Sequence, residues 1–312
     1  MSFSAKCKNE LARKVPEKEC CRLAELSALI RMDGTIKLEA GQKISLWIDT
    51  ENAAVARKTI KLIKNLFDID TQTLVRRRQR LRKNNVYRVE VAHQPGLMRM
   101  LQQTGTDWIM GRGMEQWEGK HLDKLCCQKA YLRGAFLAAG SVNDPQAGSY
   151  HLEIVSHDHG QLNLLRRMIN RFKLEPRLTN RKDGEMLYLK GAEKIIGFLS
   201  LVGAHSALLN FENIRIYKDI RNNVNRLVNC DSANLNKSVN AAARQIEAIQ
   251  LIAAETGLDK LSPALRDIAY MRMENPDVSL KELGEMMDPP LGKSAVNHRI
   301  RRIEQAAAKY KR

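Results

Sequence analysis

The sequence lacks three features that would place it in large classes of protein. No run of about 18 uncharged apolar residues occurs, so no segment is expected to span a membrane. Residues 1–14 are charged where a secretory signal needs an apolar stretch, so we expect the chain to stay in the cytoplasm. The C-x-x-C spacing of zinc sites is also absent. We therefore interpret the pairs Cys20–Cys21 and Cys126–Cys127 as small reduced residues within helices, and expect no metal and no cofactor.

Positive charge is present in large excess. The 312-residue chain has a formal net charge of +17. Such a balance favours an anionic partner, which could be nucleic acid, acidic lipid or an acidic protein. A soluble protein that is merely basic is the alternative. The length allows two domains, or one large domain with an appended module.

Two segments, Cys20–Gly34 and Cys126–Gly140, share one layout. Each begins with a cysteine pair and ends in glycine: CCRLAELSALIRMDG and CCQKAYLRGAFLAAG. The period of 106 residues is too long for a solenoid, so it indicates a duplicated domain. Small residues along both segments predict two helices that pack closely at the centre. The terminal glycines are expected to cap these helices in the left-handed conformation.

Similar elements are expected after each segment. The first copy predicts strands at 35–39 and 43–50, a helix at 52–67, a hairpin of 73–81 with 86–92 and a helix at 96–103. The second predicts strands at 141–144 and 149–156, a helix at 158–172, a hairpin of 176–182 with 185–191 and a helix at 193–202. The fold class is therefore α+β, with each copy running α-ββ-α-ββ-α.

The segments LSALIRMDG and LRGAFLAAG resemble the motif of LAGLIDADG homing endonucleases. The chain as a whole is more similar to the bacterial WhiA family, in which this duplicated fold precedes a C-terminal helix-turn-helix. The supporting stretches include YLRGAFLAAGSVNDP, NCDSANLNKSVNAAARQIEAI and SLKELGEMMDPPLGKSAVNHRIRRIE, of which the last two are long and specific. It implies a DNA-binding regulator of transcription, with roles in cell division, chromosome segregation or sporulation.

Cleavage of DNA by this fold needs one metal-binding carboxylate at the base of each central helix. The first copy has Asp33 at that position, but the second has Ala139. Asp33 is therefore a vestigial candidate, and we expect no catalytic residue and no nuclease activity. Metal-dependent cleavage remains the alternative from the enzyme class, and a protein-interaction scaffold anchored to DNA is a third hypothesis.

A run of arginines follows the first central helix and its hairpin. Because side chains alternate along a strand, Arg76, Arg78, Arg80 and Arg82 are expected on one face, where they could contact phosphates. The alternative is a solvated charge run that protects a sheet edge. The second copy has fewer cations at the matching place, so the DNA footprint could be asymmetric.

The C-terminal region predicts three helices. Pro263–Glu274 is the first, Ser279 with Glu282 forms a capping box for the second, and the third runs from about Lys293 to Lys309. The last two predict a helix-turn-helix similar to sigma-factor region 4, whose final helix enters the major groove. The candidate DNA-binding residues are Ser279, Lys281, Lys293, Ser294, Asn297, His298, Arg299, Arg301 and Arg302. Among them, Asn297 is suited to adenine, and Arg301 is suited to guanine or phosphate.

The expected domains are 1–220 for the duplicated region, with copies at about 20–105 and 126–205, then a helical linker at 221–245 and a helix-turn-helix domain at 246–312. The expected partner is double-stranded DNA, with the transcription machinery or another regulator as a further partner, at the nucleoid in the cytoplasm. The duplication already supplies pseudo-two-fold symmetry within one chain. A monomer is therefore compatible with the sequence, and the oligomeric state stays open.

Overall fold

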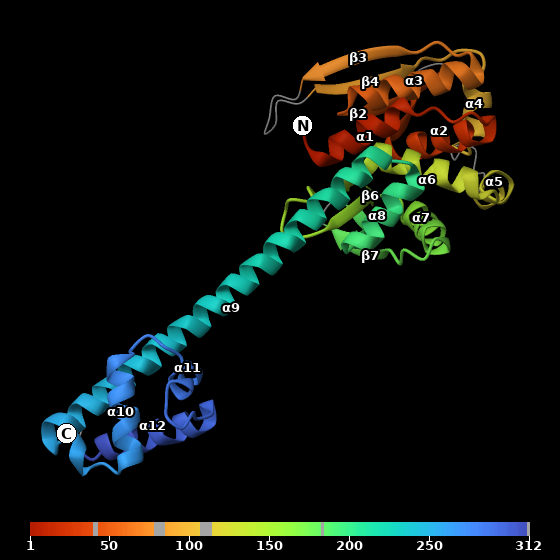
Figure 1. Cartoon of the computed structure of the whole chain (residues 1–312). Coiled ribbons are helices and arrows are strands. Elements are labelled where there is room, and N and C mark those ends of the chain that lie inside the picture. The colour runs from red at the N-terminus through yellow and green to blue at the C-terminus, as the bar shows by residue number, and fades with distance from the viewer. Residues whose placement is uncertain (40–42, 78–84, 107–113, 182–183, 311–312) are drawn as a thin grey trace. The chain divides into compact units, whose positions relative to one another are not determined.

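The fold was analysed in a computed structural model that describes residues 1–39, 43–77, 85–106, 114–181 and 184–310. The chain divides into two compact units, Met1–Lys218 and Asp219–Arg312 (Figure 1). The first unit mixes helices with two sheets and the second is helical, which confirms the α+β class and the duplicated layout. Among the described helices, none combines the length and the hydropathy needed to cross a membrane.

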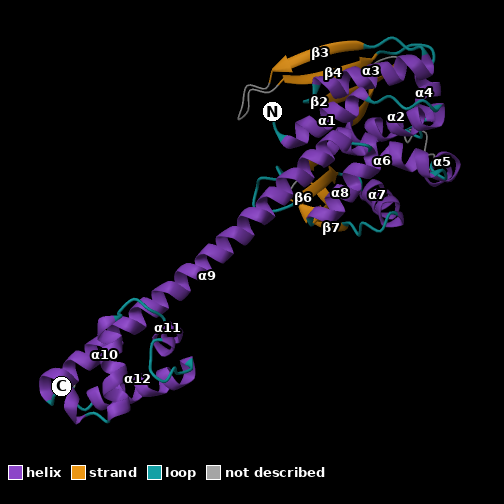
Figure 2. Cartoon of the chain, in the orientation of Figure 1, coloured by secondary structure: helices purple, strands orange, loops and turns teal. Residues whose placement is uncertain are grey.

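The first unit opens with a helix that the sequence analysis missed, α1 (Phe3–Arg13), followed by the first copy. That copy consists of α2 (Glu19–Asp33), β1 (Gly34–Glu39), β2 (Lys43–Thr50), α3 (Ala53–Phe67), β3 (Gln72–Arg77), β4 (Asn85–Val91) and α4 (Leu97–Gln103). A second unexpected helix, α5 (Met114–His121), joins the copies. The second copy consists of α6 (Leu125–Ala139), β5 (Gly140–Val142), β6 (His151–Ser156), α7 (His159–Arg171), β7 (Arg177–Arg181), β8 (Gly184–Lys190) and α8 (Ala192–Val202) (Figure 2).

The two sheets have equivalent topology. Their strand orders are β1-β2-β4-β3 and β5-β6-β8-β7, with every neighbouring pair antiparallel. Matching positions also share a register, because Gly34 pairs with Ile48 in the first sheet as Gly140 pairs with Ile154 in the second. In both sheets the strand that follows the α3 or α7 helix lies at an edge. The arginine-rich strand β3 is one of these edges.

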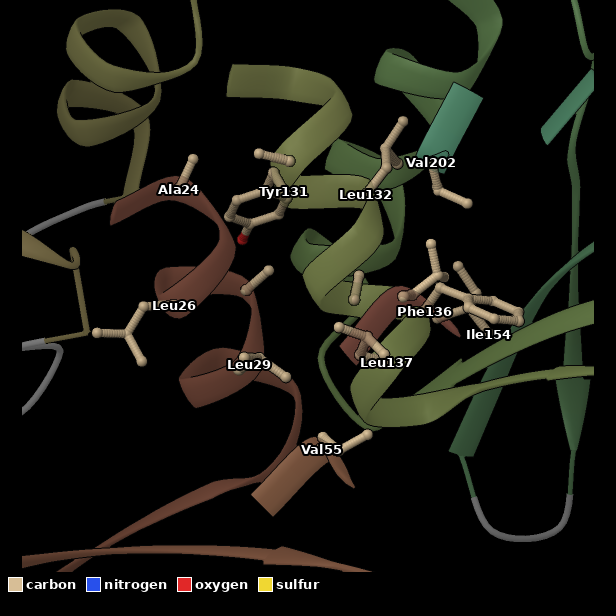
Figure 3. Close-up of a cluster of buried hydrophobic side chains, with 14 of the residues drawn as sticks. Ala24, Leu26, Leu29, Val55, Tyr131, Leu132, Phe136, Leu137, Ile154 and Val202 are labelled. Carbon is tan, nitrogen blue, oxygen red and sulfur yellow. The ribbon is translucent and has the colours of Figure 1, made fainter. Parts of the chain in front are cut away.

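The two central helices, α2 and α6, pack directly against each other (Figure 3). Leu26 and Leu29 on one helix and Leu132 and Phe136 on the other are fully buried. Gly134 permits the close approach, because a Cβ atom there would lie 2.4 Å from the backbone oxygen of Glu25. The sequence prediction of closely packed helices with small residues at their contact is therefore confirmed.

The prediction for the terminal glycines of these helices was wrong. Gly34 and Gly140 follow the helices with φ of −79° and −80°, which is extended rather than left-handed backbone. Crowding explains the residue type instead. A Cβ atom at Gly34 would lie 2.2 Å from the oxygen of Ile30, and one at Gly140 would lie 2.3 Å from the ring of Phe136.

A charged network lies inside the first unit. The carboxylate of Glu25 is fully buried and pairs with the ammonium of Lys58 from α3 and, at 3.3 Å, with the guanidinium of Arg133 from α6. Lys58 also donates to the carbonyls of Leu11 and Lys14 at 2.9 and 2.6 Å. The carboxylate of Glu25 thus joins α2, α3 and α6, and Lys58 extends the network to the end of α1.

Helix α9 (His205–Glu255) contributes residues to both units. Its first turn is capped by Glu10 of α1, whose carboxylate accepts hydrogen bonds from the backbone of Ser206 and Ala207 at 2.9 Å each. The second unit adds the short 3-10 helix η2 (Leu258–Lys260) and the helices α10 (Pro263–Glu274), α11 (Leu280–Glu285) and α12 (Lys293–Ala307). All three predicted C-terminal helices are therefore confirmed.

Candidate nucleic-acid interface

The second unit encloses its own apolar core, which holds α10, α11 and α12 together. Ile268, Leu283, Val296, Ile300 and Ile303 are at most 1% exposed. The spacing of the last three places them on one side of α12, as the 3.6-residue period requires. This core orients α12 so that its other side faces outward.

The turn between α11 and α12 depends on Gly284. The backbone nitrogen of Leu291 donates to the carbonyl of Gly284 at 2.8 Å. A Cβ atom at Gly284 would lie only 2.1 Å from the oxygen of Leu291, so a larger residue would push the turn away. Glycine is thus needed here for close approach of two backbone segments.

Arg272 holds the segment that leads into the helix-turn-helix. It is 2% exposed, and its Nη1 atom donates to the carbonyls of Asn275, Pro276 and Val278 at 3.1, 3.3 and 2.8 Å. Burial lowers the pKa of this guanidinium. No role for Arg272 is predicted from the sequence. Its position within the α10 pattern, among apolar residues, was the available signal.

The outward side of α12 carries polar and cationic residues. Successive residues of a helix turn by about 100°, which places Ser294, His298 and Arg301 on the side opposite the core. These three are exposed, as are Lys293 in the first turn and Arg302 next to Arg301. Asn297 is half-buried at the flank of this side. Most of the predicted reading residues are therefore brought together on one helix surface.

Three predicted contact residues have partners within the second unit. Ser279 and Glu282 form the predicted capping box, with bonds of 2.7 and 3.3 Å. Lys281 lies 3.7 Å from Glu285 in an exposed ion pair. Arg299 reaches the carbonyl of Ala264 on α10 at 3.5 Å. Ser279 and Arg299 thus help to position the helices.

The predicted arginine face of the first sheet is described only in part. Arg76 is exposed on β3, whereas Arg78, Arg80 and Arg82 lie outside the described residues. All six residues of β3 are exposed, including Leu74 and Val75. This edge strand is therefore accessible on both faces.

Trp47 is the centre of a compact cluster on the outer face of the same sheet. The ammonium of Lys37 lies 3.4 Å from the centroid of one of its rings, and the guanidinium carbon of Arg88 lies 4.0 Å away. Arg88 also pairs with Asp49 through two bonds of 2.7 and 2.6 Å. Two cations of this face are therefore held by an aromatic ring, and one of them by a carboxylate as well.

The corresponding face of the second sheet has an acid at its centre. The register places Glu153 where the first sheet has Trp47. Its carboxylate lies 3.4 Å from His151 and 3.5 Å from Arg181. The two sheet faces therefore differ at their centres, where one has an indole ring beside two cations and the other has a carboxylate.

An open pocket lies at the base of the central helices, where the LAGLIDADG resemblance implies metal-binding carboxylates. Asp33, Asp49 and Glu51 line it together with Ala139 and Lys8. Burial raises the pKa of Asp33 to about 6, although the nearby Lys8 opposes this shift. Lys8 comes from α1 and donates to the carbonyl of Ala138 at 3.0 Å.

These residues do not fit the two-metal arrangement of the nucleases. Metal ions there need carboxylates from both central helices, and α6 offers Ala139 at the required place. The ammonium of Lys8 lies at the end of α6, where its positive charge would repel a divalent cation.

The two cysteine pairs meet, which the sequence analysis did not foresee. The Sγ atoms of Cys20, Cys21, Cys126 and Cys127 all lie within 4.8 Å of one another. Burial raises the pKa of Cys21 to about 12 and raises that of Cys127 as well. Each pair lies in a helix, as expected, but the packing of α2 on α6 combines them into one cluster. Their identical place in both copies was the signal that could have predicted this.

Comparison with known proteins identifies the family of each region. Residues 19–106 match the WhiA N-terminal LAGLIDADG-like domain, residues 128–221 the WhiA LAGLIDADG-like domain, and residues 224–307 the WhiA C-terminal HTH domain. A protein of Desulforamulus reducens named "Probable cell division protein WhiA" is 54% identical over 312 residues, which cover 99% of this chain and 96% of the relative. A protein of the same name from Heliobacterium modesticaldum is 49% identical and covers 100% and 98%.

Solved structures agree with this result. The crystal structure of full-length DUF199/WhiA from Thermatoga maritima matches with a TM-score of 0.60 and 25% identity, over 99% of both chains. The N-terminal LAGLIDADG domain of DUF199/WhiA matches in fold, with a TM-score of 0.52, 20% identity and coverage of 65% of this chain and 90% of that one. The chain described here therefore belongs to the WhiA family.

Proposed function

We propose that this protein is a DNA-binding regulator of cell division that reads double-stranded DNA through α12. The observation that carries the proposal is the two-sided character of this helix. Val296, Ile300 and Ile303 pack into the core, whereas Ser294, His298 and Arg301 are exposed on the opposite side. The family match of residues 224–307 to a helix-turn-helix domain and the cell-division names of the relatives support the same conclusion.

The roles within this surface follow from chemistry. The first turn of α12 presents unpaired backbone N–H groups and Lys293, which suit a phosphate. Arg301 can bond two acceptors of a guanine edge, and Asn297 can bond an adenine. Arg302 is assigned to the phosphate backbone. Ser279 and Arg299 are assigned mainly to positioning, because each bonds to the backbone or to another helix of the unit. Lys281, whose pair with Glu285 is exposed, stays a candidate phosphate contact.

The test is binding of the full chain to a DNA sequence enriched from a random pool and, separately, to random duplex DNA. Arg301→Ala is expected to weaken binding to the enriched sequence by about 1–3 kcal/mol and random DNA much less. The matched control is Lys260→Ala, which removes an exposed cation of the same unit from η2. Binding should also weaken steeply with salt, since cations that contact phosphates displace counterions.

Two outcomes would contradict this assignment. Equal losses for Arg301→Ala and Lys260→Ala would remove α12 from the reading surface. A flat response to salt would argue against a DNA partner altogether. Equal loss on enriched and random DNA for Arg301→Ala alone would move this residue from base recognition to phosphate contact.

We further propose that the LAGLIDADG-like copies do not cleave DNA. Two observations support this. Only one of the two required positions holds a carboxylate, Asp33, because the other is Ala139, and the ammonium of Lys8 lies beside them. Incubation of the enriched duplex with the full chain and Mg²⁺ or Mn²⁺ should leave both strands intact. Nicking that is abolished in Asp33→Ala would overturn this proposal.

A second function for the same region is docking of another protein on the sheet faces. The observation that favours it is that two carboxylates on these faces already occupy the guanidinium groups beside them. Asp49 pairs with Arg88 and Glu153 with Arg181, which leaves fewer cations for phosphates. Arg76→Ala then leaves DNA affinity unchanged, whereas a sheet that lies on DNA predicts a weaker complex with a shallower salt dependence.

A cytoplasmic, nucleoid-associated location follows from the proposed DNA partner, and roles in chromosome segregation and sporulation stay predictions of the family resemblance.

A further inference from the structure

The four cysteines of the central helices occupy equivalent places in the two copies. Cys20 and Cys21 are the second and third residues of α2, and Cys126 and Cys127 are the second and third residues of α6. Because α2 packs on α6, both pairs face the same point at the start of the helices. The cluster lies outside the helix-turn-helix and does not line the Asp33 pocket.

The spacing of the sulfurs matches that of ligands to one ion. All four Sγ atoms lie within 4.8 Å of one another, and those of Cys126 and Cys127 are 4.0 Å apart. A Zn–S bond of about 2.3 Å in tetrahedral geometry separates the sulfurs by about 3.8 Å. Shifts of less than about 1 Å, within reach of small side-chain rotations, would therefore close the site.

Other arrangements of cysteine fit these positions less well. Packing of α2 on α6 brings matching positions together, but packing alone does not require cysteine at all four, since other small residues would fill the same space. The cysteines of a [4Fe–4S] cluster bind separate irons, so their sulfurs stand further apart than those around one ion. Disulfides would leave two independent links, each requiring an S–S distance of about 2 Å.

The surroundings suit a negatively charged site. Four thiolates and one Zn²⁺ carry two net negative charges, and the site lies at the N-termini of two helices, where the peptide dipoles favour anions. The residues before these helices are Lys18 and Lys124, and neither helix is capped by a side chain. Cys20 and Cys126 are half-exposed while Cys21 and Cys127 are buried, so an ion has a route to an otherwise enclosed site.

We propose that Cys20, Cys21, Cys126 and Cys127 bind one Zn²⁺ ion as a closed tetrathiolate site that links the two LAGLIDADG-like copies. Four protein ligands leave no open position for a substrate, so the site is structural. Deprotonation of the thiols on binding releases four protons, and the ion neutralises half of the resulting charge. The site adds a bond between α2 and α6 at the end opposite to the pocket of Asp33.

The test begins with the unaltered full chain, purified under reducing conditions without added metal or chelator. Elemental analysis should find one zinc per chain. Replacement by Co²⁺ should give the intense visible absorption of tetrahedral cobalt together with thiolate charge-transfer bands. Removal of the metal with a strong chelator should lower the melting temperature of the chain and expose four additional reactive thiols.

The variants separate the site from the other cysteines. Cys20→Ser and Cys126→Ser change the two half-exposed ligands, and each should lose most of the bound zinc and the cobalt spectrum. The matched control is Cys230→Ser on α9, an exposed cysteine outside the cluster, which should retain both. Circular dichroism of each variant verifies folding, and the measurements on the unaltered chain stand even if a variant fails to fold.

Three results would overturn the proposal. The first is a folded chain that contains no zinc and does not take up Co²⁺, with all six thiols reactive after mild unfolding. The second is iron with sulfide in place of zinc, which would make the site a cluster. The third is a pair of disulfides joining the two helices, detected by mass spectrometry of peptides from the unreduced protein.

Discussion

Replacement of Glu25 by glutamine should destabilise the first unit strongly. The side chains of Glu25 and Lys58 are 0% exposed, and Arg133 lies 3.3 Å from the same carboxylate. Glutamine keeps the size of the side chain but removes its charge. Lys58 would then be a buried cation with only the carbonyls of Leu11 and Lys14 and an amide oxygen as partners.

The size of the effect follows from the cost of an uncompensated buried charge. Removal of one partner from a buried ion pair costs about 3–5 kcal/mol. The remaining amide oxygen still accepts a hydrogen bond, so we expect the lower limit, about 3 kcal/mol. For a unit of this size, 1 kcal/mol shifts the melting temperature by about 2–4 °C, which predicts a decrease of roughly 6–12 °C.

The assay is urea and thermal unfolding of the full chain, in which the transition of the first unit is the quantity measured. Glu118→Gln is the matched control, because Glu118 pairs with Arg167 at 2.8 Å and the arginine is 64% exposed. The control should lose less than about 1 kcal/mol. Addition of Lys58→Met to Glu25→Gln should recover part of the loss, since no lysine charge remains buried. Equal effects of Glu25→Gln and Glu118→Gln would refute the reasoning.

Three further predictions concern single residues. The folded-state pKa of Asp33, about 6, exceeds its ordinary value of 3.8, so this carboxyl lowers the stability of the fold increasingly as the pH rises between these values. Asp33→Asn should therefore be more stable than the parent at pH 8, by up to about 3 kcal/mol. The two proteins should be equally stable near pH 4 in urea unfolding. Gly284→Ala should cost the second unit about 1–3 kcal/mol and weaken DNA binding. Gly292→Ala, which has open space around its Cβ position, should cost less than about 1 kcal/mol in calorimetry, because alanine only weakens the N-cap of α12. Arg272→Gln should cost the second unit about 1–3 kcal/mol in thermal unfolding, because the carbonyls of Asn275, Pro276 and Val278 lose their charged donor.

Periodicity and repetition were sufficient to predict most of the fold from sequence. The two copies of the repeat revealed the duplication, and turn residues separated the strands. Local capping was equally clear, because the Ser279–Glu282 box occurs as expected. Sequence periodicity also predicted which side of α12 is buried, through Val296, Ile300 and Ile303.

Contacts between distant segments were the main source of error. Nothing local shows that Lys8 on α1 lies beside Asp33, or that Glu25 shares its carboxylate with helices from both copies. The terminal glycines were assigned to left-handed caps, because the crowding that selects them is a property of the packed helices. The cysteine pairs were judged by the spacing within each pair, whereas their proximity arises only from the contact of α2 with α6.

The joining of two copies in one chain lets them diverge independently wherever they do not touch. Asp33 has become Ala139 in the second copy, and Trp47 of one sheet corresponds to Glu153 of the other. A symmetric homodimer could not make such changes, since each substitution would appear twice. Local crowding can also keep one residue type in both copies, as at Gly34 and Gly140, but a site built from both copies requires it of the pair together. The matched cysteine pairs satisfy that condition, so they mark the place where the two copies still depend on each other.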